Sequence, residues 1–203
     1  NADTVGPFYE AAATHDTLAG LFARTVVLVE GPTESAALPV YLRKVGLDPV
    51  RDGIAVVSVG GVGNLAKWFR FFDAYGVPTY VIFDNDARDD ADGVRRADLI
   101  SALEIDDELA NTLIAAPTIQ IQPTVSVFGG NFEESLRSLF GAEYTDLERE
   151  GREIYGLTGD QSKPLLARFV ADRIVLNEGT DAQSALGRLA AAITERGEDN
   201  REA

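Results

Sequence analysis

Residues 25–30 read Thr-Val-Val-Leu-Val-Glu, an almost unbroken run of β-branched and apolar side chains that ends in an acidic residue. Such a run predicts a strand buried on both faces, which is typical of a parallel sheet. A helix should follow, because the Gly-Pro-Thr sequence at 31–33 can form a turn and apolar residues between 37 and 45 recur at helical spacing. The run therefore predicts the first strand and helix of a βαβ unit.

The alternation of strands and helices continues along the chain. Residues 54–59 (Ile-Ala-Val-Val-Ser-Val) and 78–83 (Pro-Thr-Tyr-Val-Ile-Phe) predict two more buried strands, and 118–121 (Thr-Ile-Gln-Ile) predicts a weaker fourth. Asn64 can cap an intervening helix whose apolar residues in 65–72 follow an i, i+3, i+4, i+7 pattern. The sequence thus predicts an α/β fold, with a Rossmann-like parallel sheet of about four strands flanked by helices.

After Pro123 the pattern predicts helices only. Apolar residues recur at helical spacing in three segments, 132–140, 165–170 and 186–193. Ser162 can cap the second of these helices, which places Lys163 in its first turn. We therefore divide the chain into a leader segment with a short helix, an α/β core and a helical extension, at 1–24, 25–125 and 126–203.

The composition excludes several classes of protein. The chain has 203 residues, no cysteine and a net charge of −15, so disulfide scaffolds, thiolate zinc sites and cysteine nucleophiles are excluded. It has no apolar run of about 18 residues and no secretory signal pattern, which predicts a cytoplasmic protein without a membrane partner. Its first residue is Asn1 rather than Met, which predicts a piece of a longer protein. The acidic balance argues against binding to nucleic acid, because phosphate contacts need Lys and Arg.

Acidic residues stand where two of the predicted strands end. Glu30 closes the first strand and Glu34 follows it by four positions, while Asp84 and Asp86 directly follow the third strand. The carboxyl ends of parallel strands meet at one edge of a sheet, so these four carboxylates should lie together and repel one another. A single acidic residue at a strand end is usually a solvated loop residue, but two pairs in one small sheet favour a site for hard cations such as Mg²⁺ or Mn²⁺.

A glycine cluster follows the second strand. Gly60, Gly61 and Gly63 could let backbone N–H groups approach a phosphate. The cluster lacks the Gly-Lys-Ser/Thr of a P-loop and the G-x-G-x-x-G of dinucleotide folds, so we expect no ATP hydrolysis by this chain.

Three blocks of sequence together resemble the signature of the Toprim domain, which topoisomerases, primases, RNA maturases, RecR-type repair proteins and OLD (overcoming lysogenization defect) family nucleases share. The blocks are Val-Leu-Val-Glu-Gly-Pro-Thr-Glu at 27–34, Ser-Val-Gly-Gly-Val-Gly-Asn at 58–64 and Val-Ile-Phe-Asp-Asn-Asp at 81–86. The residues of these blocks, together with Ser-Lys-Pro at 162–164 in a helical tail, are most similar to those of OLD nucleases. The similarity extends over about residues 20 to 175.

The resemblance implies a metal-dependent DNA endonuclease that uses two Mg²⁺ or Mn²⁺ ions, with Ca²⁺ as a non-productive substitute. It implies that the catalytic residues are Glu30, Glu34, Asp84, Asp86 and Lys163. It implies metal ligation by the same four carboxylates together with Glu133, although the adjacent Glu134 is an alternative ligand. It also implies that the metal-binding loops are shaped by Gly31, Ser58, Gly60 and Gly61.

The partners implied are DNA and an ABC-type ATPase region, which complete OLD proteins carry before this domain and which this sequence lacks. Lys163, with Arg168 and Arg137 near it in the helical extension, is the expected contact to the DNA backbone. We expect the isolated chain to be a monomer and the complete protein a dimer, in phage defence or DNA repair. Two alternatives stay open: another Toprim activity such as RNA maturation or primer synthesis, and a non-catalytic binding module of the RecR type.

Overall fold

The computed structural model describes residues 15–85, 93–159 and 162–199. Five strands form one sheet in the order β2-β1-β3-β5-β4. They are β1 (Thr25–Val29), β2 (Ile54–Ser58), β3 (Thr79–Asp84), β4 (Gln120–Ile121) and β5 (Val125–Phe128). All neighbouring pairs are parallel except β4 with β5, which is antiparallel. The predicted α/β class is confirmed, with a sheet that is mostly parallel.

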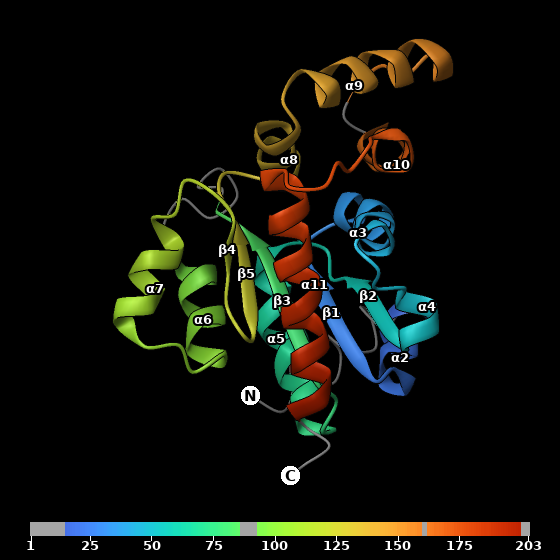
Figure 1. Cartoon of the computed structure of the whole chain (residues 1–203). Helices are drawn as coiled ribbons and strands as arrows, with labels where there is room; N and C mark the ends of the chain where they lie inside the picture. Colours follow the sequence, from blue (N-terminus) through green and yellow to red (C-terminus); the bar gives the residue numbers. More distant parts are fainter. Residues whose placement is uncertain (1–14, 86–92, 160–161, 200–203) are drawn as a thin grey trace.

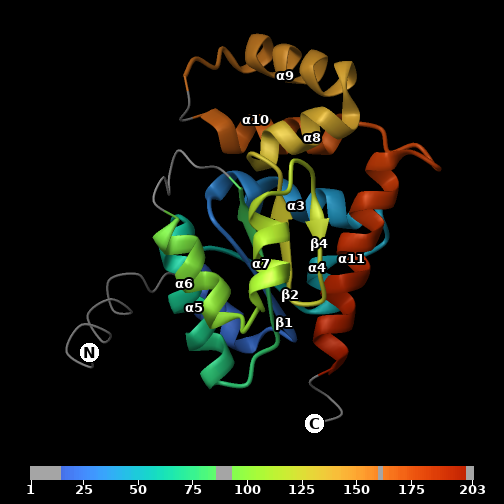
Figure 2. The ribbon, with the colours of Figure 1, turned by 90° about the vertical axis from the view of Figure 1, so that its left-hand side faces the viewer.

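Helices cover both faces of this sheet (Figures 1 and 2). In chain order they are α2 (His15–Ala19), the 3-10 turn η1 (Gly20–Phe22), α3 (Pro32–Lys44), α4 (Pro49–Asp52), α5 (Val62–Ala74), α6 (Val94–Ala102), α7 (Asp107–Ile114), α8 (Phe132–Phe140), α9 (Ala142–Tyr155), α10 (Lys163–Arg173) and α11 (Asp181–Asp199). Residues of α5, α6 and α7 share one apolar core with the sheet, and residues of α3, α8, α10 and α11 share the other. Helices α8, α9 and α10 gather beyond one end of the sheet (Figure 1).

Strand β1 is fully buried and feeds both cores, as its sequence predicts. Val26 and Leu28 belong to the core that contains α5, whereas Val27 and Val29 belong to the core that contains α3 and α11. Successive side chains of a strand point to opposite faces, so a strand buried on both sides needs a continuous apolar run. The register of β1 against β2 and β3 brings their carboxyl ends to one edge.

The end of the chain returns to the start of the sheet. Helix α11 packs on β1 and β3, and the Nε atom of Arg196 donates to the carbonyl oxygen of Thr79 at 3.1 Å. Gly197 lies so close to Thr25 that an added Cβ would overlap the threonine hydroxyl. The residues of the C-terminal third therefore help to close the same core as the first strand.

Two predictions about the strands are wrong. Residues 54–59 were expected to be a buried strand, but β2 lies at the edge of the sheet and four of its five residues are only partly buried. Residues after Pro123 were expected to be helical, but β5 at Val125–Phe128 is a fully buried strand parallel to β3. The sheet therefore has one strand more than expected, and β5 spans the proposed boundary between 125 and 126.

Two predicted helix caps are also different in the structure. Helix α5 begins at Val62 with Gly61 at the cap position, so Asn64 lies inside the first turn instead of before it. Ser162 does precede α10, but its side chain makes no capping hydrogen bond. Among the helices within the described ranges, none combines the length and the apolar character that crossing a membrane would require.

Candidate active site

A cleft of about 490 Å³ opens where the carboxyl ends of the strands meet α8 and α10. Its lining comes from the end of β1 with the start of α3, the loop after β2, the end of β3, and the first turns of α8 and α10. The residues are Glu30, Gly31, Pro32, Thr33, Glu34, Gly60, Gly61, Asp84, Asn131, Glu133 and Lys163. The cleft thus brings together most of the residues that the sequence singles out.

Glu30 and Asp84 link the two central strands at this edge. The Oε1 atom of Glu30 accepts a hydrogen bond of 2.7 Å from the backbone N–H of Asp84. The carboxylate of Asp84 in turn accepts one from the backbone N–H of Phe132 at the start of α8. Burial, and then the charges of Glu34, Glu30 and Glu133, raise the pKa of Asp84 to about 9 from its ordinary 3.8. Four carboxylates therefore act on one another in a poorly solvated place.

Glu34 is buried in the first turn of α3. Its Oε2 atom accepts the backbone N–H of Gly31 at 3.1 Å, so this carboxylate also satisfies an N–H at the start of the helix. Burial raises the pKa of Glu34, and the charge of Glu133 raises it further. Glu34 and Glu133 come from helices far apart in the sequence, but both line the cleft, so α8 contributes to the same cluster.

The loop after β2 supports the end of β1. Gly60 and Gly61 have φ angles of 76° and 109°, in the left-handed region where a side chain is strained. The backbone N–H of Gly61 donates to the carbonyl oxygen of Glu30 at 2.7 Å. The amide of Asn64 donates to the carbonyl oxygens of Val59 and Gly60, which explains its position inside α5 rather than before it. Of the four residues predicted to shape the loops, Gly31, Gly60 and Gly61 line the cleft, whereas Ser58, in β2, does not.

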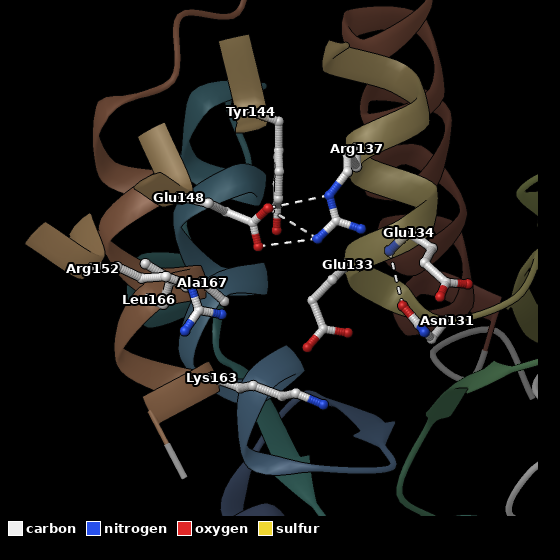
Figure 3. A pocket seen from close by; sticks show the side chains of 10 residues that line it. All are labelled: Asn131, Glu133, Glu134, Arg137, Tyr144, Glu148, Arg152, Lys163, Leu166 and Ala167. Carbon is white, nitrogen blue, oxygen red and sulfur yellow. Dashed lines mark hydrogen bonds and ion pairs between the residues drawn. The ribbon is translucent and has the colours of Figure 1, made fainter. Parts of the chain in front are cut away.

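The helical layer contributes Glu133 and Lys163. Both line the cleft and also a second pocket beside it. In Figure 3 the side chain of Glu133 extends between Arg137 and Lys163, while that of Glu134 turns away from them. Glu134 lines only the second pocket. Of these two alternative ligands, Glu133 therefore faces the other carboxylates.

The two arginines expected beside Lys163 differ in position. Arg137 lines the second pocket, where it pairs with Glu148. Arg168 lines neither the cleft nor the second pocket. Its Nε atom pairs with Asp172 at 3.0 Å and its Nη1 atom donates to the carbonyl oxygen of Ala36, so its guanidinium holds α10 against α3. Arg168 thus lies outside both cavities, and its contact with the DNA backbone stays a prediction.

Asp86 lies outside the described residues. Among those that the structure does describe, no three His, Asp or Glu side chains are arranged so that they could hold one metal ion together. The shared cleft is thus what brings the described acidic residues together, and the raised pKa values of Asp84 and Glu34 agree with it.

Two asparagines at the site were not predicted as functional. Asn131 caps α8, since its Oδ1 atom accepts the backbone N–H of Glu134 at 2.8 Å, and it lines both the cleft and the second pocket. Its position before an acidic first turn and an apolar stripe was the available signal. Asn85 donates to the carbonyl oxygens of Ile114 and Ala116 and accepts from the Nη1 atom of Arg96. These bonds anchor Asn85 at the end of β3, and no local sequence pattern predicts them.

Comparisons with known proteins give one matching family model and several similar folds. Residues 21–86 match the family model described as the TOPRIM domain of overcoming lysogenization defect protein-like proteins. The C-terminal region of the Xanthomonas campestris pv. campestris OLD protein, in its platinum-phased structure, has a TM-score of 0.65 at 17% identity, over 91% of this chain and 98% of that chain. The C-terminal region of the Burkholderia pseudomallei OLD protein has a TM-score of 0.52 at 24% identity, over 89% of this chain and 98% of that chain. A search of curated proteins found no match.

The matched segment 21–86 contains Glu30, Glu34, Asp84 and the glycine loop, so it holds most of the cleft. The structural matches extend over the helical layer as well. Residues 21–86 therefore match an OLD-like Toprim domain, within a chain that has the fold of the C-terminal regions of OLD proteins.

Proposed function

We propose that this chain is a divalent-metal-dependent DNA endonuclease, the nuclease part of an OLD-family protein that acts in the cytoplasm in phage defence or DNA repair. The observation that carries the proposal is the cleft itself, in which Glu30, Glu34, Asp84 and Glu133 meet beside Lys163. The core at 25–125 would supply the first three carboxylates, and the extension at 126–203 would supply Glu133 and Lys163. An ABC-type ATPase region would be the partner in the complete protein.

The chemistry of the cleft fits divalent cations. Burial and three neighbouring carboxylates raise the pKa of Asp84 to about 9, so the simultaneous ionisation of these carboxylates is unfavourable without a bound cation. Toprim domains generally bind divalent metals, and clustered carboxylate oxygens are the ligands that Mg²⁺ and Mn²⁺ prefer. Glu30, Glu34, Asp84, Asp86 and Glu133 would hold two such ions, and Ca²⁺ would bind without supporting cleavage.

Each part of the cleft would then have a task. Bound divalent ions supply an activated water and neutralise the leaving oxygen of a phosphodiester. Lys163, at the exposed start of α10, would donate to a non-bridging oxygen of the phosphate. Gly31, Gly60 and Gly61 would let the DNA backbone approach without meeting side chains. A net charge of −15 should repel DNA phosphates, and local positive charge from the ions and Lys163 would offset this repulsion at the cleft.

The proposal is tested by incubating supercoiled plasmid with the purified chain in Mg²⁺, Mn²⁺, Ca²⁺ or EDTA. We expect nicking or linearisation with Mg²⁺ or Mn²⁺ only. Cleavage should vanish in an Asp84→Ala/Asp86→Ala variant and fall about 10²- to 10³-fold in Lys163→Met. Asp73→Asn, which changes an exposed acid of α5, is the matched control and should cleave as the wild type does. A folded chain that cuts neither plasmid nor single-stranded DNA with any of these ions would contradict the proposal.

A second candidate is the non-catalytic binding module. One observation favours it: within the described ranges, no three acidic or histidine side chains stand in a metal-holding arrangement. Thermal unfolding with and without Mn²⁺ separates the two candidates. Metal-linked stabilisation that the Asp84→Ala/Asp86→Ala variant loses supports the nuclease, whereas an unchanged melting temperature in the wild type supports the module.

A further inference from the structure

A second pocket, of about 180 Å³, lies between α8, α9 and α10 and adjoins the cleft (Figure 3). It shares Asn131, Glu133 and Lys163 with the cleft, so the two cavities are continuous at these residues. Its other lining residues are Glu134, Arg137, Tyr144, Glu148, Arg152, Leu166 and Ala167. This volume has room for several water molecules, and so for a small anion such as a phosphate group.

Arg137 is held rigidly in this pocket. Its Nε atom donates to Glu148 at 3.1 Å, and its Nη2 atom donates to both carboxylate oxygens at 3.0 and 2.9 Å. The guanidinium also lies 5.6 Å from the centre of the Tyr144 ring. A two-point pair of this kind fixes the plane of the guanidinium. The orientation of Arg137 is therefore set before any ligand arrives.

Arg152 completes the basic side of the pocket. Arg137, Arg149, Arg168 and Arg173, the other described arginines of α8 to α10, all pair with a carboxylate. Arg152 makes no ion pair within the part of the chain that the structure describes. In Figure 3 its guanidinium lies on the same side of the pocket as Lys163. Its charge is therefore available to an anion that enters the pocket.

A buried hydroxyl without a partner lies behind the pocket. Tyr41 is fully buried, and among the described residues its Oη atom has no hydrogen-bond partner. Its pKa is raised by burial, and further by Tyr144 and Glu148, which shows that it lies close to these two lining residues. Buried hydroxyls are almost always hydrogen-bonded, directly or through water. The unsatisfied hydroxyl thus indicates a bound water or another polar group close to Tyr41.

We propose that this pocket binds a DNA phosphate that neighbours the one at the cleft, with Arg152 and Arg137 as the binding residues. The inference rests on the proposed function, because Glu133 must be engaged by cations in the cleft for the pocket to become attractive to anions. With Glu133 so engaged and the side chain of Glu134 turned away from Arg137, the basic residues of the lining, Arg137 and Arg152, lie beside the carboxylate of Glu148. Lys163, which lines both cavities, would stand between the two phosphates.

The test measures binding of a fluorescent DNA duplex by anisotropy, in Ca²⁺ and over a series of salt concentrations. Arg152→Gln should weaken binding about 5- to 10-fold and lower the salt slope by about one. Arg149→Gln, on the same helix but paired with Asp146 and outside the pocket, is the matched control and should change binding less than twofold. Glu148→Gln removes a negative charge from the pocket and should tighten binding about two- to threefold.

The outcomes separate this inference from the endonuclease proposal. Equal affinities of Arg152→Gln and Arg149→Gln, or no DNA binding by the wild type, overturn the subsite. If Arg152→Gln alone binds DNA more weakly, the subsite is supported. This holds even if the wild type fails to cut plasmid with every metal ion tested, in which case only the endonuclease proposal fails. Tighter binding of Glu148→Gln would show that the pocket attracts an anion, and weaker binding would count against it.

Discussion

Replacing Asp84 by Asn should stabilise the metal-free protein while removing its response to metal. The amide oxygen of Asn can still accept the backbone N–H of Phe132 that the carboxylate of Asp84 accepts. Asn carries no charge, so it escapes both the burial penalty and the repulsion from Glu30, Glu34 and Glu133 that act on Asp84. A residue placed for function would then be a stability defect in the absence of its ligand.

The magnitude follows from the pKa of Asp84. With a folded-state pKa of about 9 against an ordinary 3.8, the folded chain keeps Asp84 protonated at pH 7, whereas the unfolded chain ionises it. Taking up this proton costs about 1.4 kcal/mol for each pH unit above 3.8, or about 4 kcal/mol at pH 7. The pKa of Asp84 is higher in the folded chain than in the unfolded chain. The contribution of protonated Asp84 to the free energy of unfolding is therefore complete below pH 3.8 and is lost progressively as the pH rises to about 9. The advantage of Asp84→Asn should therefore grow from about 1.5 kcal/mol at pH 5 to between 2 and about 4 kcal/mol at pH 7.

The assay is urea unfolding in EDTA at pH 5 and pH 7, followed by thermal unfolding with added Mn²⁺. The exposed substitution Asp73→Asn should stay within about 0.5 kcal/mol of the wild type at both pH values. Mn²⁺ should raise the melting temperature of the wild type and of Asp73→Asn but not that of Asp84→Asn. An Asp84→Asn variant that is less stable than the wild type at pH 7, or an advantage that does not grow with pH, would refute the reasoning.

Three more predictions concern the scaffold. Gly151→Ala would press a Cβ to 2.7 Å from side chains of α10 and should cost about 1 to 3 kcal/mol in urea unfolding, whereas Gly187→Ala, in open space on α11, should gain about 0.5 to 1 kcal/mol. Asn85→Ala breaks its hydrogen bond to Arg96 and two to carbonyl oxygens, and should lower the unfolding free energy by about 1 to 3 kcal/mol; an unchanged urea midpoint would contradict this anchoring role. Tyr41→Phe removes a hydroxyl without a partner, so its unfolding free energy should stay equal to the wild type or rise by about 1 kcal/mol; a clear loss would reveal a bound water or ligand.

The central part of the fold was predictable because apolar runs decide it. β1 and β3 are fully or almost fully buried, so their sequences are continuous and unmistakable. The acidic residues at their ends are then placed by topology, since parallel strands end at the same edge. Glu30 and Asp84 consequently lie in one cleft, as expected.

The remaining features depend on contacts between distant segments. β5 has four residues between Pro123 and a glycine pair, which is too short for periodicity to distinguish a strand from a helix. The pairing of Arg137 with Glu148 joins α8 to α9, and the contact of Arg168 with a carbonyl oxygen of α3 spans much of the chain. The amino-acid composition gives the number of charged residues, but it does not show which of them form ion pairs with each other in the fold.

Helix α11 is synthesised after the proposed site residues, yet it packs on β1 and β3, which position two of them. The order of synthesis should therefore affect when the site forms. Every carboxylate of the cleft, and Lys163, is translated before residues 181–199. Until α11 leaves the ribosome, the face of the sheet that carries Val27 and Val29 lacks part of its cover, so we expect the strands that align the carboxylates to be less stable. Limited proteolysis of chains stalled near residue 180 would reveal this open stage. A nascent or truncated chain without α11 therefore already carries the proposed site residues, and we expect it to be inactive.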